Sequence, residues 1–579
     1  MPTNDGKTMK KIVSLYLILL NIASIYATVL DDLDCSFDQD FSIQKGFSLS
    51  NGPDPIIPYS PCEFTKITEK QIRACEALTN HPKWETFQDV TEYYALHEES
   101  QLDRNFCFMA THLMGVIIHG GLRQDDLAFQ LKEFDIRRLL SNGPYKNPCL
   151  SMSAQDLIYK ALQPLSHVID THLHNLGYDE GNYLNPESAA YQKAERKDYL
   201  LFATLRYAAG MSFVHGSTHE ARKRIHLYAG HFPKLAGMIL PIHKSILPSG
   251  KVEWKLTGSF LNNHSALVTA MTFENPYKDS ELFPAVSIHP FDIQWREKLL
   301  DAYAKGIRLV KWMPPQSIPP DSPFLDSFYQ WMSQLKMTLI AHAGMEHAIP
   351  TSESNKHWSD WGNPLRFRKP LQKGVSVILA HCGHKDLLPD LDDPKQNKIP
   401  GYQLFIRLAR EAHRKNKSGE WTGLLYGDLA AVTTHYGPDF IKELLKVANE
   451  PGIRLLYGSD YPYTNLVQPK NDAYDLCCAA GLLSLNDAIS LKEIRSWNPL
   501  LANFIFTKTL AWLVDDQTTL RFPEASFTGE FKGAEVDLIN RFQWTEYKKQ
   551  YSLRIGFKAL SDIDVIPSEC FELFKPFLG

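Results

Sequence analysis

The pattern of apolar and polar residues changes character near residue 166. From there to about residue 513, apolar runs of about five to eight residues alternate with longer stretches that carry charge at helical spacing. There are eight such runs, and they begin at His167, Leu235, Pro284, Ile307, Met337, Val375, Gly423 and Arg454. Short apolar runs between amphipathic stretches are typical of buried parallel strands joined by helices. We therefore predict a parallel β-sheet with intervening helices over residues 166–513.

The number and spacing of these runs predict the architecture. Most steps from one run to the next are about 20 to 50 residues, which is the size of one strand–helix unit. Eight such units in a single domain are typical of a (β/α)8 barrel. The first step is longer and contains a helical stretch over residues 195–211 and room for a loop over the mouth. The predicted fold class is α/β, a distorted (β/α)8 TIM barrel over residues 166–513.

The flanking regions lack this alternation. Residues 28–165 begin as an irregular segment rich in Pro, Asn, Ser and Asp, and become helical from about residue 81. The apolar stretch 106–119 is shorter than the roughly 20 residues that cross a bilayer, so it predicts a buried helix. Residues 514–579 mix aromatic and charged side chains. We interpret the first region as a helical N-terminal region and the last as a C-terminal extension packed on the barrel.

The first 27 residues have the pattern of a secretory signal peptide. Two basic residues, Lys10 and Lys11, precede a short apolar stretch that ends at the small residue Ala27. We therefore expect an exported protein, periplasmic or secreted, with no stable membrane insertion once the signal is cleaved. The alternative is an uncleaved N-terminal membrane anchor. Five of the nine cysteines lie before residue 150, which agrees with an oxidising compartment.

Composition and charge narrow the class of partner. Apolar residues make up 44% of the chain and charged residues 22%, the proportions of a soluble globular protein. The formal net charge is −5, and no Lys- or Arg-rich block occurs. Nucleic-acid binding is therefore not expected. We expect a small-molecule substrate, and a homo-oligomer is compatible with the sequence.

Candidate chemistry is concentrated where the predicted strands end. His172 and His174 lie in DTHLH, Lys311 in VKWMPP, His342 in LIAHAG, His381 in ILAHCG and Asp460 in LYGSDYP. Residues two apart on a strand point to the same side, and the C-terminal strand ends of a barrel meet at one rim. Taken alone, each of these side chains is more often structural than a metal ligand. Together, such groups are costly in buried runs unless they are paired or coordinated, so the set predicts a metal site.

These motifs also carry a resemblance. In the order DTHLH, HAG, AHCGH and GSDYP, they resemble the amidohydrolase superfamily, within it the amidohydrolase-related group with the aminocarboxymuconate-semialdehyde decarboxylase-like enzymes. The resemblance covers about residues 166–510. It implies that His172, His174, His342 and Asp460 hold one divalent metal, with zinc expected. It also implies catalytic roles for His381, beside the metal-activated water or the substrate, and for Asp460, which would also shuttle a proton.

Lys311 has two interpretations. In binuclear relatives a lysine at this place is carboxylated and bridges two metals, and His342 and His381 then bind the second ion. Alternatively, Lys311 stays an ammonium that binds a substrate carboxylate or pairs with a buried carboxylate, for which Asp428 in YGDLAA is a candidate. We favour the second interpretation and one metal per chain.

Three functions follow from the same residues. The first is a metal-dependent hydrolase that uses a metal-activated water on an amide, lactone or ester. The alternative enzyme is a lyase, a non-oxidative metal-dependent decarboxylase of a small carboxylic acid. The third is a catalytically inactive barrel that acts as an interaction scaffold. All five of these motifs carry a side chain suited to chemistry, which favours an enzyme, and we take the hydrolase as the first hypothesis.

Overall fold

The eight predicted strands are all present. The computed structural model describes residues 150–177, 182–184, 218–273, 279–346, 358, 360–462, 473–534 and 536–554. The strands are β1 (Val168–Leu173), β3 (Leu235–Ile239), β5 (Glu281–Pro284), β6 (Leu309–Trp312), β7 (Thr338–Ala341), β8 (Val377–Leu379), β11 (Leu425–Asp428) and β12 (Leu455–Leu456). The prediction of an α/β fold with parallel strands is therefore confirmed.

One strand differs from its predicted range. The third apolar run begins at Pro284, whereas β5 ends there. The backbone beyond Pro284 still pairs with its neighbours, because the Ala285 amide donates to the Ile239 carbonyl at 2.9 Å. The run is therefore the end of an extended segment that starts earlier than the sequence pattern suggests.

The eight strands form two parallel sheets that touch at both edges. Hydrogen bonds join the first sheet in the order β1-β3-β5 and the second in the order β12-β11-β8-β7-β6. An isolated parallel bridge pairs Val286, just after β5, with Val310 of β6. A second parallel bridge pairs Leu173 of β1 with Tyr461, which follows β12. The two sheets are thus adjacent at both ends of the strand order.

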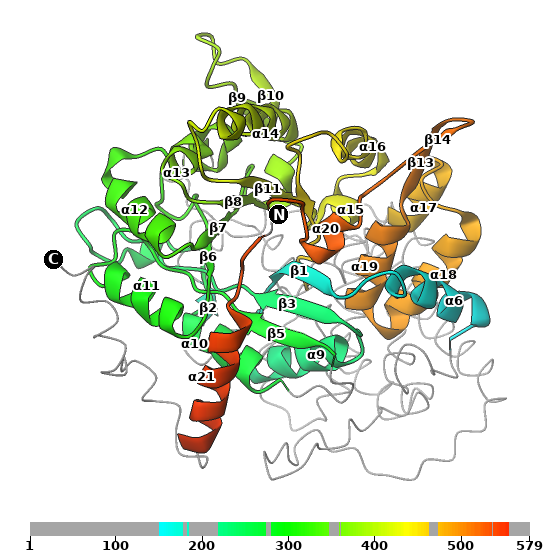
Figure 1. The fold of residues 1–579 in the computed structure, drawn as a ribbon, viewed down its shortest axis with the longest axis horizontal. Coiled ribbons are helices and arrows are strands. Elements are labelled where there is room, and N and C mark those ends of the chain that lie inside the picture. Colours follow the sequence, from blue (N-terminus) through cyan, green and yellow to red (C-terminus); the bar gives the residue numbers. More distant parts are fainter. Residues whose placement is uncertain are drawn as a thin grey trace, which may run out of the picture.

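Helices alternate with these strands along the chain, outside the sheets (Figure 1). Those between strands are α9 (Thr218–Gly230), α10 (Asn263–Met271), α11 (Trp295–Ala304), α12 (Asp326–Gln334), α13 (Arg368–Gln372), α14 (Gly401–Lys417), α15 (Val432–His435) and α16 (Pro438–Val447). In α14 the buried positions include Leu404, Phe405 and Leu408, the i, i+1, i+4 spacing of a helix face turned to a core. Basic residues in its last turn complement the helix dipole.

Further elements surround this core. The helices are α6 (Met152–Leu162) before β1, and α17 (Ala473–Ala479), α18 (Leu485–Trp497) and α19 (Pro499–Thr509) after β12. Short two-stranded ladders pair β2 (Tyr183–Leu184) with β4 (Ser259–Phe260) and β9 (Leu387–Pro389) with β10 (Lys398–Pro400). Single 3-10 turns are η2 (Trp254–Leu256), η3 (Pro323–Leu325), η5 (Pro364–Phe367) and η6 (Ala380–Gly383).

The C-terminal part contacts the segment just before β6. It consists of a hairpin of β13 (Ala511–Asp515) and β14 (Thr518–Arg521), then α20 (Ala525–Thr528) and α21 (Arg541–Arg554). The Asn540 amide donates to the Gly306 carbonyl at 2.7 Å. Gly306 has φ +85°, and an added Cβ would lie 2.7 Å from both the Asn540 carbonyl oxygen and the Trp544 amide nitrogen. Only glycine fits this close approach.

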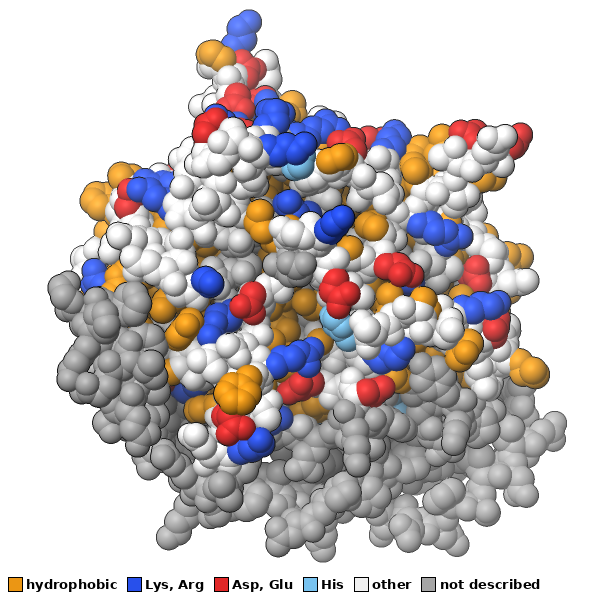
Figure 2. All heavy atoms as spheres, in the orientation of Figure 1, with side chains coloured by type: hydrophobic (Ala, Val, Ile, Leu, Met, Phe, Trp, Pro, Cys, Tyr) orange, Lys and Arg blue, Asp and Glu red, His pale blue; other side chains and the backbone are white. Residues whose placement is uncertain are grey.

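Several predictions fall outside the described residues. These are the signal peptide over residues 1–27, nearly all of the region 28–165 and the helix expected at 195–211. Among the residues that the structure describes, none of the helices has the length and apolar character needed to cross a membrane. On the face drawn in Figure 2, acidic and basic side chains are interspersed.

Candidate metal centre

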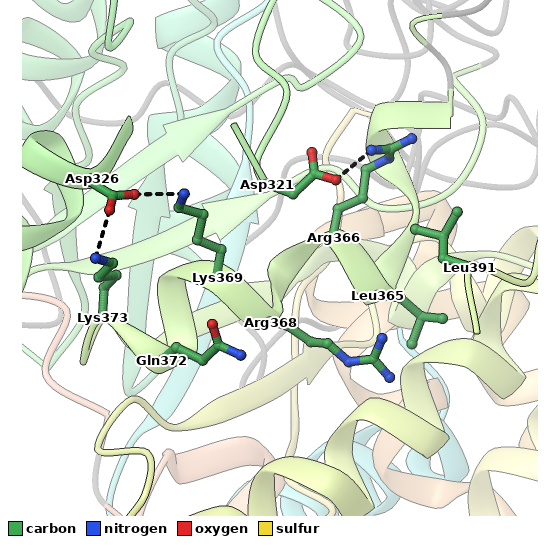
Figure 3. A pocket seen from close by; sticks show the side chains of 9 residues that line it. All are labelled: Asp321, Asp326, Leu365, Arg366, Arg368, Lys369, Gln372, Lys373 and Leu391. Carbon is green, nitrogen blue, oxygen red and sulfur yellow. Dashed lines mark hydrogen bonds and ion pairs between the residues drawn. The ribbon is translucent and has the colours of Figure 1, made fainter. Parts of the chain in front are cut away.

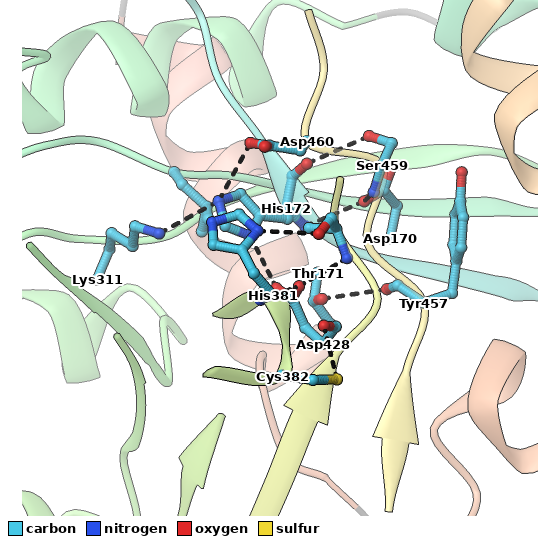
Figure 4. Close-up of polar contacts among 12 residues, drawn as sticks. Asp170, Thr171, His172, Lys311, His381, Cys382, Asp428, Tyr457, Ser459 and Asp460 are labelled. Atoms are coloured by element: carbon cyan, nitrogen blue, oxygen red, sulfur yellow. Dashed lines mark hydrogen bonds and ion pairs between the residues drawn. The ribbon is translucent and has the colours of Figure 1, made fainter. Parts of the chain in front are cut away.

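Backbone hydrogen bonds bring Asp460 to the end of β1. The Asp460 amide donates to the His172 carbonyl at 2.8 Å, and the His174 amide donates to the Tyr461 carbonyl at 3.0 Å. Asp460 itself has φ +57°, a left-handed conformation that turns the chain sharply after β12. The Thr171 hydroxyl also donates to the Tyr457 carbonyl at 3.1 Å, so residues 286 positions apart share one strand end (Figure 4).

Three of the predicted ligands lie together at this strand end. The Nε2 atoms of His172 and His174 are 3.1 Å apart. The Oδ1 atom of Asp460 is 3.5 Å from Nε2 of His172 and 3.9 Å from Nε2 of His174. All three side chains are buried, and one ligand atom from each lies within 4.8 Å of the others. The structure therefore brings together the HxH pair and the carboxylate that the sequence placed in one site.

The other ring nitrogen of each histidine is occupied by an oxygen. Nδ1 of His174 lies 3.0 Å from the Leu240 carbonyl oxygen, which can only accept, so this nitrogen carries the proton. Nδ1 of His172 lies 2.7 Å from Oδ2 of Asp428 and donates to that carboxylate. Burial holds the pKa of both imidazoles well below the ordinary value. Each ring is therefore neutral, with its lone pair on Nε2.

This arrangement fits a divalent cation. Two nitrogen lone pairs that face each other at 3.1 Å repel unless a positive charge lies between or beside them. Two neutral imidazoles and a carboxylate form a ligand set that zinc prefers. Histidines that bind a metal commonly donate their second nitrogen to a carboxylate or a carbonyl, as both do here. The residues present thus match the metal predicted from the sequence.

His381 presents a third imidazole beside this group. It lies in η6, directly after β8, and its Nδ1 donates to the Ala430 carbonyl at 2.9 Å. Its ring centroid is 5.3 Å from that of His172. Burial, together with the neighbouring His342 and His172, holds its pKa well below the ordinary value. His381 is therefore a neutral imidazole whose Nε2 remains for a ligand or a substrate.

His342 lies next to His381 rather than within the group of three. The two ring centroids are 5.1 Å apart. Nε2 of His342 is 3.2 Å from the Met345 carbonyl oxygen, and Nδ1 is 3.4 Å from a carboxylate oxygen of Glu346. Both nitrogens thus face oxygen acceptors, in contrast to the rings of His172 and His174. The assignment of His342 as a metal ligand stays a prediction.

Lys311 points at the same centre. Its Nζ atom lies 3.2 Å from Nε2 of His172, and the side chain is buried. Burial lowers the pKa of Lys311 to about 8, although Asp428, Asp460 and Glu346 oppose the shift. Asp428 was a candidate partner for this ammonium, but its carboxylate bonds the ring of His172 instead. Lys311 is therefore the cation that faces the histidine lone pairs in this structure.

Two buried carboxylates support the site; the sequence analysis gives Asp170 no role and considers Asp428 only as a partner for Lys311. Asp428 contacts the ring of His172, whereas Asp170 contacts backbone amides and the Ser459 side chain. Oδ1 of Asp170 accepts from the amides of His172 at 3.0 Å and Ser459 at 2.9 Å, and burial raises its pKa to about 7. The signal for both was an acidic residue within an apolar run, DTHLH for one and YGDLAA for the other.

A surface pocket lies apart from this centre, between α12 and α13 (Figure 3). Its cations are paired with carboxylates. Arg366 lies 2.6 Å from Asp321, and Lys369 and Lys373 each lie 2.7 Å from Asp326. The pocket is therefore an internally neutralised charge network rather than a second catalytic candidate.

Comparison with known proteins agrees with the motifs. Residues 290–495 match the family model described as amidohydrolase. This range contains Lys311, His342, His381 and Asp460, and the HxH pair precedes it.

Two solved structures are similar to the chain. One is a probable 2-pyrone-4,6-dicarboxylic acid hydrolase from Acinetobacter baumannii, 13% identical, covering 59% of this chain and 99% of that chain, with a TM-score of 0.30. The other is also described as a 2-pyrone-4,6-dicarboxylic acid hydrolase and comes from Pseudomonas putida. It is 15% identical, covering 59% of this chain and 98% of that chain, with a TM-score of 0.30. No curated protein matches the chain.

Proposed function

We propose that this chain, of which residues 290–495 match the family model described as amidohydrolase, is a metal-dependent hydrolase of an amide, lactone or ester. His172, His174 and Asp460 would hold one divalent metal, zinc being the expected ion, with His342 as a further ligand. The observation that supports this most strongly is the pair of Nε2 lone pairs that face each other at 3.1 Å beside the Asp460 carboxylate.

The protein's own residues divide the remaining work. A divalent metal, when bound, lowers the pKa of a water and polarises a carbonyl oxygen. Asp460 approaches the imidazoles through Oδ1, so its Oδ2 remains to accept a proton and pass it to a leaving group. His381 is held through Nδ1 by the Ala430 carbonyl. Its Nε2 would orient the substrate or polarise the bond that reacts. Lys311 would remain an ammonium that attracts an anionic part of the substrate.

The eight strands would form a closed, distorted (β/α)8 barrel. The two isolated bridges support this proposal, because they place the two sheets side by side at both ends of the strand order. In a barrel, side chains at the C-terminal strand ends share one mouth. His172, Lys311, His381 and Asp460 lie at such ends.

We also propose export, on the pattern of residues 1–27 alone. Microsequencing of the mature protein from its native host tests this. A mature chain that begins after Ala27 would support a cleaved signal, and an intact N-terminus in a membrane fraction would support the alternative anchor.

Activity on a substrate panel tests the proposed reaction. The panel contains lactones, esters, amides and aromatic acids, and it is applied to wild type and Asp460→Asn. We expect wild type to hydrolyse at least one of the first three classes and Asp460→Asn to lose about 10²–10⁴-fold in kcat/KM, since it removes a proton acceptor. Asp321→Asn, a surface carboxylate paired with Arg366, is the control and should keep wild-type activity.

Other outcomes of this experiment would replace the proposal. Release of CO₂ from an aromatic or other small acid, without incorporation of water, would make the enzyme a decarboxylase. Metal-free protein with no activity on the panel, whose stability does not change on chelation, would favour an interaction scaffold. Equal activity in wild type and Asp460→Asn would remove Asp460 from the reaction.

A further inference from the structure

We propose that Asp428 is the positioning residue of the metal centre, because it fixes the metal-binding tautomer of His172 and the turn that carries His381. This inference rests on the proposed metal-dependent function. Asp428 is the last residue of β11 and is fully buried. It contacts the two histidines through different oxygens, so one side chain connects β11 with the residues that follow β8 and with β1 (Figure 4).

The first contact determines which nitrogen of His172 can bind a metal. Oδ2 of Asp428 lies 2.7 Å from Nδ1 of His172. Because the carboxylate accepts a proton-bearing nitrogen there, the lone pair stays on Nε2, which faces His174 and Asp460. Without this acceptor, the His172 proton could equally reside on Nε2 and block that position. Asp428 thus removes a competing state of the free protein.

The second contact supports a strained turn. Oδ1 of Asp428 accepts from the Ala430 amide at 2.8 Å and from the His381 amide at 3.3 Å. His381 and Cys382 have φ values of +59° and +51°, a left-handed conformation that is unfavourable for a residue with a Cβ. The Cys382 thiol also donates to the Asp428 carbonyl at 3.2 Å. Asp428 therefore stabilises the conformation that points the His381 ring at the site.

Asp428 differs from the other ring supports in one respect. The rings of His174 and His381 are held by the backbone carbonyls of Leu240 and Ala430, whereas the support of His172 is a side chain. A single substitution can therefore change the tautomer of His172 and leave the other two supports in place. Burial raises the pKa of Asp428, while His381, Lys311 and the amides of Ala430 and His381 lower it.

The experiment compares Asp428→Asn with Asp170→Asn. Both substitutions replace a fully buried aspartate by its amide beside the same strand end, but Asp170 accepts from the amides of His172 and Ser459 and bonds no histidine ring. Zinc affinity is measured for wild type and both variants by competition with a chelator. We expect Asp428→Asn to lose about 10–100-fold in zinc affinity. Asp170→Asn should change the zinc affinity much less, because Asp170 bonds no metal-facing ring.

A spectroscopic measurement separates positioning from general damage. Nitrogen NMR of metal-free, histidine-labelled protein reports which ring nitrogen of His172 carries the proton. We expect the Nδ1–H form in wild type and in Asp170→Asn. In Asp428→Asn the amide group can donate to Nδ1, so we expect a shift to the Nε2–H form.

The outcomes separate this inference from the proposed function. Wild-type protein with Nε2–H on His172 overturns the inference, and this result needs no variant that might fail to fold. Unchanged zinc affinity in a folded Asp428→Asn also overturns it. If wild-type protein has the Nδ1–H form of His172 but binds no zinc, the proposed metal-dependent function is contradicted. The tautomer assignment is then still correct.

Discussion

The strand ends carry two groups of buried histidines that differ in where their lone pairs point. In the first group, His172, His174 and His381 each donate Nδ1–H to an oxygen, which leaves Nε2 for the centre of the site. The second group, His243 and His289, lies after β3 and β5, with ring centroids 5.0 Å apart. Both groups are almost completely buried, so burial alone does not distinguish them.

In the second group every ring nitrogen has a partner. His243 donates Nδ1–H to the Lys244 carbonyl at 2.9 Å and accepts from the Met313 amide at Nε2, also at 2.9 Å. His289 accepts from the Phe291 amide at 3.1 Å and contacts the Ser317 hydroxyl at 3.0 Å. These rings have no lone pair left for a ligand. The comparison teaches that the hydrogen bonds of a buried histidine, rather than its position, mark it as a candidate ligand.

The largest difference between the two groups should appear when one histidine of each is replaced by alanine. We expect His174→Ala to lose nearly all bound metal, since it removes one of three converging ligand atoms. His243→Ala should keep its metal but lose about 1–3 kcal/mol of unfolding free energy, because the buried Met313 amide loses its acceptor. Metal content and denaturant unfolding of the two variants check this. Metal loss in His243→Ala, with His174→Ala unaffected, would reverse the assignment of the groups.

A smaller effect should appear in the pH dependence of stability. Burial lowers the pKa of His243 to about 4, below its ordinary 6.5, so the folded protein holds this ring neutral. As the pH falls below 6.5, the unfolded chain takes up a proton that the folded chain does not, and stability declines. From the unfolded and folded pKa values, the loss by pH 4 is roughly 3 kcal/mol.

His243→Gln isolates this contribution. The glutamine oxygen can still accept from the Met313 amide, and the side chain does not titrate. We expect the variant to be less pH-sensitive than wild type between pH 6.5 and about 4, as measured by urea unfolding at a series of pH values. The same pH slope in both proteins would mean that His243 is not held neutral.

The sequence was sufficient for the features that depend on local pattern. Seven of the eight apolar runs contain a strand, and the run that begins at Pro284 starts at the last residue of β5. The pattern is informative because a buried strand needs a short apolar stretch wherever it lies. The HxH pair and Asp460 also lie together, since the ends of parallel strands share one side of the sheet. These predictions required no knowledge of distant contacts.

The rest depended on tertiary contacts that no local pattern contains. The sequence suggests Asp428 as a partner for Lys311, and only the folded chain places it on Nδ1 of His172, 256 positions away. His342 ends its strand as expected, yet its nitrogens face Met345 and Glu346, on the loop just beyond it. The sequence also gave no indication that His243 and His289 are fully hydrogen-bonded.

Substitution of Lys311 should have the smallest effect on metal content. It also distinguishes a site that binds one metal ion from a site that binds two. Its Nζ atom faces Nε2 of His172 as an ammonium, and the mononuclear proposal gives it no bridging role. Lys311→Met should therefore bind as much metal as wild type. This expectation does not depend on which divalent ion is bound, because it concerns only the number of ions per chain.

The most direct test of the account is elemental analysis of purified wild-type protein, with Lys311→Met measured alongside it. Two imidazole lone pairs and one carboxylate that converge on a single point predict about one divalent ion per chain in both proteins. A wild-type chain that binds no divalent ion, even when zinc is supplied in excess, would contradict the central claim. Two ions per chain, with the second lost in Lys311→Met, would replace it with a binuclear centre.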